Sequence, residues 1–295
     1  MTELEYLNKV LKAQDLTSDE VNELNEKGDE VEKFLKEKLD GISHTIKRAG
    51  SLAKNTMIRD NYDLDIVVYI DSDEDGAGET LEAIFERILK DLGGSYSTWA
   101  KTSAIRLLNQ DTASYMHVDV VPGRFFNTDK HDAWLHRTTG DKSRLKTNLK
   151  VHIEAIRDSG LVPLIRLMKF WANRNGIKAP TFVLELLVVE HAESVKSKSL
   201  VDQVIHLFTE FRDNFDSLSV VDPANPTGND LSEPLDNIRQ LLSFFAKSAL
   251  LSIDNEDWSS VFGEVEQDQA SQTNALKEVS IITRESTTKP WCDRE

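Results

Sequence analysis

The sequence contains one cysteine, Cys292, among its 295 residues. A single cysteine excludes an internal disulfide and is typical of the reducing cytoplasm. No apolar run approaches the roughly 20 residues that a membrane-spanning helix needs. The N-terminal stretch MTELEYLNKVLKAQDL also lacks the basic start and apolar core of a signal peptide. We therefore expect a cytoplasmic protein without membrane contact.

Basic residues are also in deficit. The 35 lysines and arginines face 51 aspartates and glutamates, which gives a net charge of −16. Long RNA or DNA is bound largely through lysine and arginine contacts to phosphate, so the charge argues against a long nucleic acid as partner. A small nucleotide needs only a local basic cluster and metal ions. The composition therefore leaves nucleotide chemistry open.

The first 140 residues mix helices with strands. Helical spacing of apolar residues predicts a helix over 17–39, capped by Ser18 or Asp19, and a second over 81–92. The acidic segment DSDEDGAGE between them is predicted to be a solvated connection. Patterns typical of strands cover 42–48, 66–70, 96–108 and 115–121, the last closed by Pro122 and Gly123. This order predicts an α+β domain built on a small mixed sheet.

After about residue 141 the pattern becomes helical. The predicted helices are 161–173, 181–192, 199–215 and 235–250, with a proline-rich loop before the last. From residue 263 the chain is rich in Gln, Ser, Thr and Glu. We expect a strand-rich lobe over 1–140, a helical lobe over 141–262, a functional cleft between them, and a mobile polar tail over 263–295.

Three carboxylates stand where strands usually carry apolar residues. Asp63 and Asp65 frame Leu64 at the start of a strand, and residues two apart on a strand share a face. Asp119 lies in HVDVV, inside another strand. A single Asp at a strand end is more often a solvated cap, but three of them, if the strands are neighbours, predict a site for hard cations such as Mg²⁺. Two such ions about 4 Å apart can clamp an in-line phosphoryl displacement.

Two further features fit a phosphate-bearing substrate. Gly50 and Ser51 precede the carboxylates, and glycine lets the backbone approach a phosphate whose oxygens the N–H groups and the hydroxyl can hold. Alone, such a pair usually marks a turn. Arg166, Lys169 and Asn173 share one face of the helix over 161–173, for which an ordinary solvated face is the alternative.

Together these motifs resemble the polymerase β-type nucleotidyltransferase superfamily: Gly50-Ser51, eleven residues, Asp63-Leu64-Asp65, then Asp119 in a later strand. The stretches PLIRLMKFWANRNGIKAPTFVLELLVVEHAE and VVDPANPTGND are similar to those of 2′-5′-oligoadenylate synthetases and of their bacterial relatives, the CD-NTases. The resemblance covers roughly residues 42–250. It implies a polymerase β-like fold with a mixed-sheet N-terminal lobe, a helical C-terminal lobe and the active site between them.

The resemblance also implies roles for individual residues. Asp63 and Asp65 match the metal-holding pair, and Asp119 matches the third carboxylate, which helps to activate the attacking hydroxyl. The implied cofactor is a pair of Mg²⁺ ions, for which Mn²⁺ can substitute.

The remaining matches concern ATP and other NTPs as substrates. Gly50 and Ser51 match the pair that holds the donor triphosphate, and Lys169 matches a basic residue that contacts it. Thr181 and Phe182 match a pair in which the hydroxyl reaches phosphate and the ring stacks on the donor base. Lys54 falls where some relatives carry a basic residue near the substrate.

The implied function is synthesis of a cyclic di- or oligonucleotide second messenger in bacterial antiphage signalling, with regulatory or effector proteins as partners. A ribose hydroxyl attacks an α-phosphate and pyrophosphate leaves. A linear oligoadenylate synthetase switched on by duplex RNA fits the acidic charge poorly. An archaeal CCA-adding tRNA nucleotidyltransferase would suit the sequence VDVVPG, but it must hold tRNA. An inactive binding protein of this fold usually loses a carboxylate, and all three are present.

Overall fold

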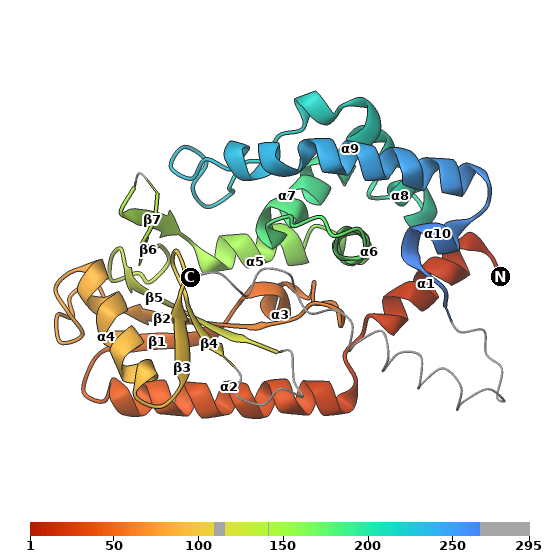
Figure 1. Cartoon of the computed structure of the whole chain (residues 1–295). Coiled ribbons are helices and arrows are strands. Elements are labelled where there is room, and N and C mark those ends of the chain that lie inside the picture. Colours follow the sequence, from red (N-terminus) through yellow and green to blue (C-terminus); the bar gives the residue numbers. More distant parts are fainter. Residues whose placement is uncertain (109–115, 141, 266–295) are drawn as a thin grey trace, which may run out of the picture. The chain divides into compact units, whose positions relative to one another are not determined.

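This computed structural model describes residues 1–108, 116–140 and 142–265. The strands of these residues form one seven-stranded mixed sheet (Figure 1). The strand order is β1-β2-β5-β4-β3, and β6 and β7 continue the sheet from the far end of β5. The strands are β1 (His44–Arg48), β2 (Leu64–Ile70), β3 (Ser97–Ala100), β4 (Ile105–Leu108), β5 (Val118–Phe125), β6 (Ala133–His136) and β7 (Arg144–Thr147). Most of the tail predicted over 263–295 lies outside the described residues, as does position 115 of the predicted strand 115–121.

The strand β5 is longer than the sequence predicts. It runs through Pro122 and Gly123 to Phe125, so the prediction that these two residues close the strand is wrong. The antiparallel partner β4 pairs with residues up to Val120, whereas β6 pairs with β5 only from Gly123 onward. Pro122 therefore falls where one neighbour ends and the next begins, and its missing N–H costs no ladder bond to either.

Two other predictions of secondary structure need correction. The segment 96–108 is a hairpin of β3 and β4, closed by a hydrogen bond from the Lys101 N–H to the Ala104 carbonyl (2.7 Å). Residues 144–147, expected to begin the helical part, form β7 instead. Such four-residue strands are too short to show a clear alternation, and their pairing with a neighbour stabilises them.

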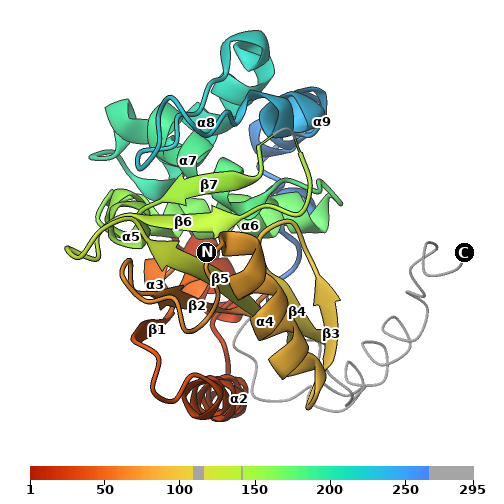
Figure 2. The ribbon, with the colours of Figure 1, turned by 90° about the vertical axis from the view of Figure 1, so that its left-hand side faces the viewer.

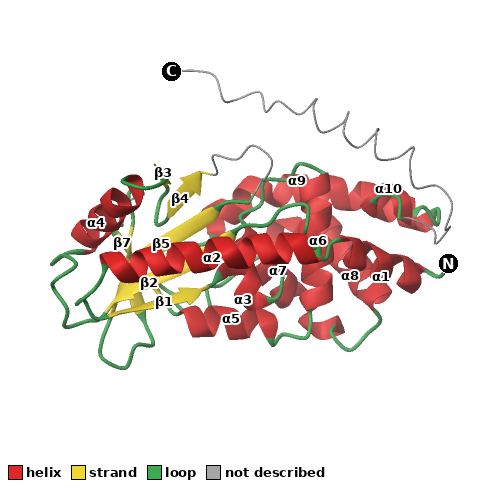
Figure 3. Cartoon of the chain, turned by 90° about the horizontal axis from the view of Figure 1, so that it is seen from below, coloured by secondary structure: helices red, strands yellow, loops and turns green. Residues whose placement is uncertain are grey.

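The two long helices of the N-terminal lobe cover one face of the sheet. Figure 3 shows α2 (Ser18–Lys38) running across the strands, and α4 (Leu81–Gly93) packs against β3, β5 and β6. Alternate residues of β2, from Leu64 to Ile70, pack with them into the main apolar core. The cap of α2 is Thr17, in a capping box with Glu20, so neither Ser18 nor Asp19 caps the helix as predicted.

The opposite face of the sheet carries a smaller core and the helices of the C-terminal half. Val67, Tyr69 and Phe125 contribute to this core, which also touches the short helix α3 (Gly50–Lys54) through Ala49. The remaining helices are α1 (Glu3–Ala13), α5 (Leu149–Arg157), α6 (Val162–Arg174), α7 (Thr181–Ala192), α8 (Leu200–Asp213), α9 (Ser232–Asp254) and α10 (Trp258–Phe262). None of the helices in the described ranges is both long and apolar enough to cross a membrane.

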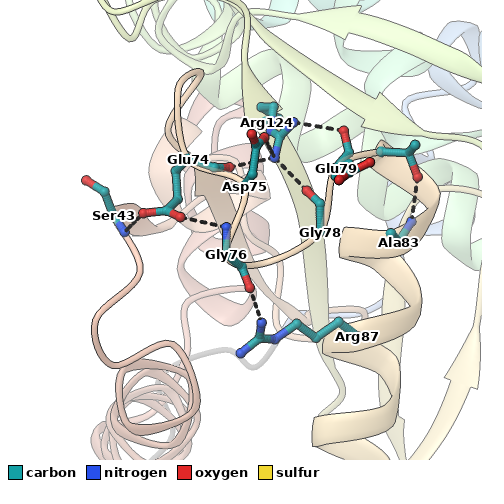
Figure 4. Close-up of polar contacts among 10 residues, drawn as sticks. Ser43, Glu74, Asp75, Gly76, Gly78, Glu79, Ala83, Arg87 and Arg124 are labelled. Atoms are coloured by element: carbon teal, nitrogen blue, oxygen red, sulfur yellow. Dashed lines mark hydrogen bonds and ion pairs between the residues drawn. The ribbon is translucent and has the colours of Figure 1, made fainter.

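The acidic loop between β2 and α4 is more ordered than the predicted solvated connection. Asp73, Asp75 and Glu79 are exposed, but Asp71 is buried, and the backbone of the loop turns onto Arg124 of β5 (Figure 4). The Arg124 guanidinium donates hydrogen bonds to the carbonyl oxygens of Glu74 (2.6 Å), Gly78 (2.6 Å) and Glu79 (3.0 Å). The Arg124 guanidinium is therefore engaged in hydrogen bonds with the backbone of this loop.

Candidate active site

The three carboxylates lie together because β2 and β5 are parallel neighbours. Asp65 and Asp119 are register partners on these strands, and Asp63 stands immediately before β2. The prediction that the two strands lie side by side is therefore confirmed. Asp65 alternates with the core residues Leu64 and Ile66, so it projects from the face opposite α2 and α4.

The electrostatics of the three carboxylates differ. Burial, followed by the charges of Asp63 and Asp119, raises the pKa of Asp65 to about 7. Burial, followed by the charge of Asp119, also raises the pKa of Asp63. Burial opposes ionisation of Asp119 too, but hydrogen bonds from Arg106 and Lys101 outweigh it and lower the pKa of Asp119. Burial and the clustered negative charge of the site therefore disfavour the ionised forms of Asp63 and Asp65.

Arg106 and Lys101 are site residues that the sequence did not reveal. Arg106 of β4 is the register partner of Asp119, and its Nε and Nη2 donate to the two Asp119 carboxylate oxygens at 2.8 Å each. Lys101 Nζ donates to Asp119 Oδ2 at 2.8 Å. Arg106 Nη2 also lies 3.5 Å from Asp63 Oδ2. The only signal in the sequence is an arginine between the apolar residues Ile105 and Leu107, which becomes informative once the hairpin is known.

The three carboxylates have the chemistry of a divalent-metal site. Among the described residues, no three Asp, Glu, His or Cys side chains are arranged as they stand to hold a metal ion together. Asp119 is engaged with two basic side chains, Lys101 and Arg106. The donor set of carboxylate oxygens still fits a hard cation, and the raised pKa values of Asp63 and Asp65 show charge that a cation would neutralise.

Gly50 is placed directly against Asp65. A Cβ atom on Gly50 would lie 1.6 Å from Asp65 Oδ2, and its φ of +59° also favours glycine. The preceding N–H, of Ala49, donates to the Asp65 carbonyl at 2.8 Å. Ser51 follows at the start of α3 and is buried. The structure thus brings the predicted Gly-Ser pair to the carboxylates, and it shows why the first residue of the pair must lack a side chain.

Lys169 lies in a buried polar cluster instead of on the solvated face that was the alternative for its helix. Its Nζ donates to the Thr56 carbonyl at 2.7 Å and lies 3.5 Å from Glu185 Oε1. Glu185 is fully buried and also accepts hydrogen bonds from Lys54 Nζ and the Thr56 hydroxyl. Burial lowers the pKa of Lys169, against the attraction of Glu185. Glu185 is a third residue that the sequence did not reveal, although one acid within the apolar run FVLELLVV is a signal.

Thr181 and Phe182 begin α7. Thr181 is exposed and Phe182 is half-buried. The Phe182 ring lies 5.5 Å from Lys54 Nζ and 4.6 Å from the His152 ring. His152 Nε2 in turn contacts Asp222 at 2.7 Å. The structure therefore brings Phe182 to Lys54, and the contact of each predicted nucleotide-binding residue with a substrate stays a prediction.

The mixed sheet with paired carboxylates on parallel strands, next to a glycine-serine pair at the start of α3 and a helical lobe, is that of a polymerase β-like nucleotidyltransferase. Residues 1–159 match the Second Messenger Oligonucleotide or Dinucleotide Synthetase (SMODS) domain. The chain belongs to this family and is an enzyme of the nucleotidyltransferase class. The resemblance to CD-NTases is therefore confirmed, as is the α+β fold class.

Individual relatives agree with this assignment. The chain is 26% identical over 243 residues to cyclic AMP-AMP-AMP synthase of Escherichia coli (strain MS 115-1), across 68% of this chain and 75% of that protein. The structure of E. coli MS115-1 CdnC with ATP matches with a TM-score of 0.70 and 19% identity, over 90% of this chain and 99% of that one. CdnG of Bradyrhizobium diazoefficiens, a CD-NTase solved with GTP, matches with a TM-score of 0.67 and 15% identity, over 89% and 96%. The fold is that of the CD-NTases, which make cyclic oligonucleotides.

Proposed function

We propose that this enzyme joins NTPs, ATP among them, into a cyclic di- or oligonucleotide with release of pyrophosphate. The observation that carries the proposal is the register of Asp65 against Asp119, with Asp63 beside them and Gly50 giving room. A relative solved with ATP and one solved with GTP support nucleotide triphosphates as substrates. CdnC has also been solved with a HORMA protein, which supports a regulatory protein as partner of the present enzyme.

The family generally uses divalent metal ions. We propose that Asp63, Asp65 and Asp119 hold two Mg²⁺ ions, with Mn²⁺ as a substitute. Such ions, when bound, polarise the α-phosphate and stabilise the charge on the leaving pyrophosphate.

The chain itself positions and orients the reactants. Asp119, kept ionised by Arg106 and Lys101, can accept a hydrogen bond from the attacking ribose hydroxyl and help to remove its proton. The two basic side chains hold both of its oxygens, so the carboxylate keeps one orientation. When metal and nucleotide are bound, these hydrogen bonds to Asp119 would have to weaken or be shared with the bound ligands.

The donor nucleotide has its own set of residues. Gly50 and Ser51 lie where a backbone can approach the triphosphate beside Asp65. Lys169 supplies positive charge from the buried cluster with Glu185. Thr181 is exposed enough to reach phosphate, and the half-buried Phe182 ring offers a face to the donor base.

The test is synthesis from purified components. The protein is incubated with Mg²⁺ and all four NTPs, and products are separated before and after phosphatase treatment and identified by mass spectrometry. A closed ring has no terminal phosphate, so phosphatase-resistant products are expected without added RNA, and none from the Asp65→Asn variant. Products that phosphatase always shifts would indicate a linear synthetase, and products formed only with tRNA would indicate a CCA-adding enzyme. Either result would overturn the proposal.

A further inference from the structure

A cavity of about 440 Å³ lies outside the candidate active site, between the last two strands of the sheet and the loop 222–229. Its volume falls within the range of small-molecule binding sites. It is lined by Trp134, Lys142, Ser143, Arg144, Lys146, Asn225 and Gly228. Figure 2 shows β6 and β7 side by side at the edge of the sheet.

The cavity belongs to the other face of the sheet from the catalytic carboxylates. Phe125 shares the face of Asp119 on β5, and its register partner Ala133 packs in the same small core. Trp134, the next residue along β6, therefore points the opposite way, together with its register partner Lys146. Arg144, two residues from Lys146, shares that face. The cavity is therefore separate from the site that holds Asp63, Asp65 and Asp119.

The lining is cationic in a chain whose net charge is −16. Lys142, Arg144 and Lys146 contribute three positive charges, and no carboxylate of the described residues lines the cavity. Lys146 is paired with Asp132 at 2.6 Å, but Lys142 donates only to the Gly228 carbonyl (2.9 Å). In the described part of the chain, Lys142 and Arg144 thus form no ion pair, although the charge of Lys142 helps to lower the pKa of the nearby Asp230.

Arg144 is held in a way that leaves its donors available. Its guanidinium carbon lies 4.4 Å from the centre of the Trp134 ring, and among the described residues it has no carboxylate partner. A guanidinium stacked on an aromatic ring keeps its N–H fork directed outward and can stack further on a planar base. The neighbouring arginine on this face, Arg124, is occupied by the acidic loop (Figure 4). Of these two arginines, Arg144 is therefore the one available to bind a phosphate.

We propose that this cavity is a second nucleotide-binding site, which takes a phosphorylated nucleoside through Arg144 and Lys142 and stacks its base beside Trp134. Arg144 and Lys142, which form no ion pair with a described carboxylate, favour phosphate, and the indole-guanidinium pair with the Asn225 amide favours a planar base with polar edges. The ligand is either an NTP or the oligonucleotide product of the enzyme, which present the same chemistry.

Binding in EDTA separates this cavity from the active site. Without divalent metal, the three clustered carboxylates disfavour a triphosphate, whereas the cationic cavity needs no metal. Equilibrium dialysis with radiolabelled ATP in EDTA is expected to show one equivalent bound to the wild-type protein. Arg144→Glu should weaken this binding tenfold or more, and Lys142→Glu should also weaken it. Lys169→Ala should leave it unchanged, because Lys169 lies in the other site.

A matched control excludes a general effect of charge. Lys33→Glu changes the net charge by the same amount at an exposed position of α2, outside the cavity. Circular dichroism confirms that each variant is folded, and the exposure of both Arg144 and Lys142 favours folded variants. Absence of ATP binding in EDTA would overturn the proposal, as would equal loss in Arg144→Glu and Lys33→Glu, or loss in Lys169→Ala alone.

Competition identifies the source of the ligand. ATP, GTP, the purified product and inorganic triphosphate are each titrated against labelled ATP. Stronger competition by the product assigns a product site, and stronger competition by an NTP assigns a substrate site. Inorganic triphosphate that competes as well as ATP would show that only phosphate is recognised, and the nucleoside part of the proposal would be wrong. Synthesis is measured separately in Mg²⁺, so failure here is distinguishable from failure of the proposed function.

Discussion

Replacement of Asp65 by asparagine should make the metal-free protein more stable while it abolishes catalysis. The substitution removes one charge from the cluster and nearly preserves the volume of the side chain. In the folded protein, burial and the charges of Asp63 and Asp119 raise the pKa of Asp65 from 3.8 to about 7. Ionised Asp65 is therefore a source of instability that the asparagine variant lacks.

The size of the effect follows from the pKa. One pKa unit corresponds to about 1.4 kcal/mol, so the rise to about 7 represents at most about 4 kcal/mol at neutral pH. The side chain of Asp65 is only half-buried, so solvent screens part of this repulsion. We expect a gain of about 1–2 kcal/mol in the free energy of unfolding, which corresponds to a rise of about 2–4 °C in Tm for a domain of this size.

The gain should depend on pH with a definite sign. Below about pH 4 the carboxyl of Asp65 is protonated in both the folded and the unfolded wild-type protein, so the two proteins should be equally stable there. As pH rises toward 7, the unfolded state ionises first and the wild-type protein loses stability relative to the variant. Above about pH 7 the full difference is present.

Thermal unfolding in EDTA at a series of pH values from 4 to 8 measures this difference. Mg²⁺ added at pH 8 should raise the Tm of the wild-type protein and have a much smaller effect on Asp65→Asn. Asp73→Asn, at an exposed acidic position, is the control and should change neither quantity. Nucleotide transfer by Asp65→Asn should fall by about 100-fold or more. A variant that is no more stable than wild type in EDTA at pH 8 would refute the reasoning.

Three further predictions concern neighbouring residues. Gly50→Ala should lower Tm and nucleotide transfer far more than Gly41→Ala, because both positions have positive φ but only a Cβ on Gly50 meets Asp65; thermal unfolding and product formation check this. Lys169→Met should raise the KM for ATP more than it lowers kcat, and should lower Tm because Glu185 loses a partner; an unchanged KM would leave Lys169 a purely structural residue. Arg106→Gln should raise the pKa of Asp119, so the acid limb of the pH–rate profile should move to higher pH, and an unmoved limb would contradict the role given to Arg106.

Much of the candidate site could be predicted from local patterns. The spacing of Asp63 and Asp65 places both on one face of a strand, whatever the strand pairs with. Asp119 in an apolar strand and Gly50 before a serine are equally local signals. The helices over 17–39, 81–92 and 161–173 follow from apolar spacing and agree closely with α2, α4 and α6. These features depend on residues within a few positions of one another, which a sequence records directly.

Other features depend on contacts between distant segments, and only the tertiary structure decided them. Arg106 becomes a partner of Asp119 because β4 pairs with β5 in one register, and a shift by one residue would point its side chain away. Lys169 is buried because α7 carries Glu185 against α6, although the pattern of its own helix allows a solvated face. The cavity beside Trp134 likewise needs the loop 222–229 to lie against β7. Local spacing determines which face a side chain takes, but pairing across the chain determines what that face meets.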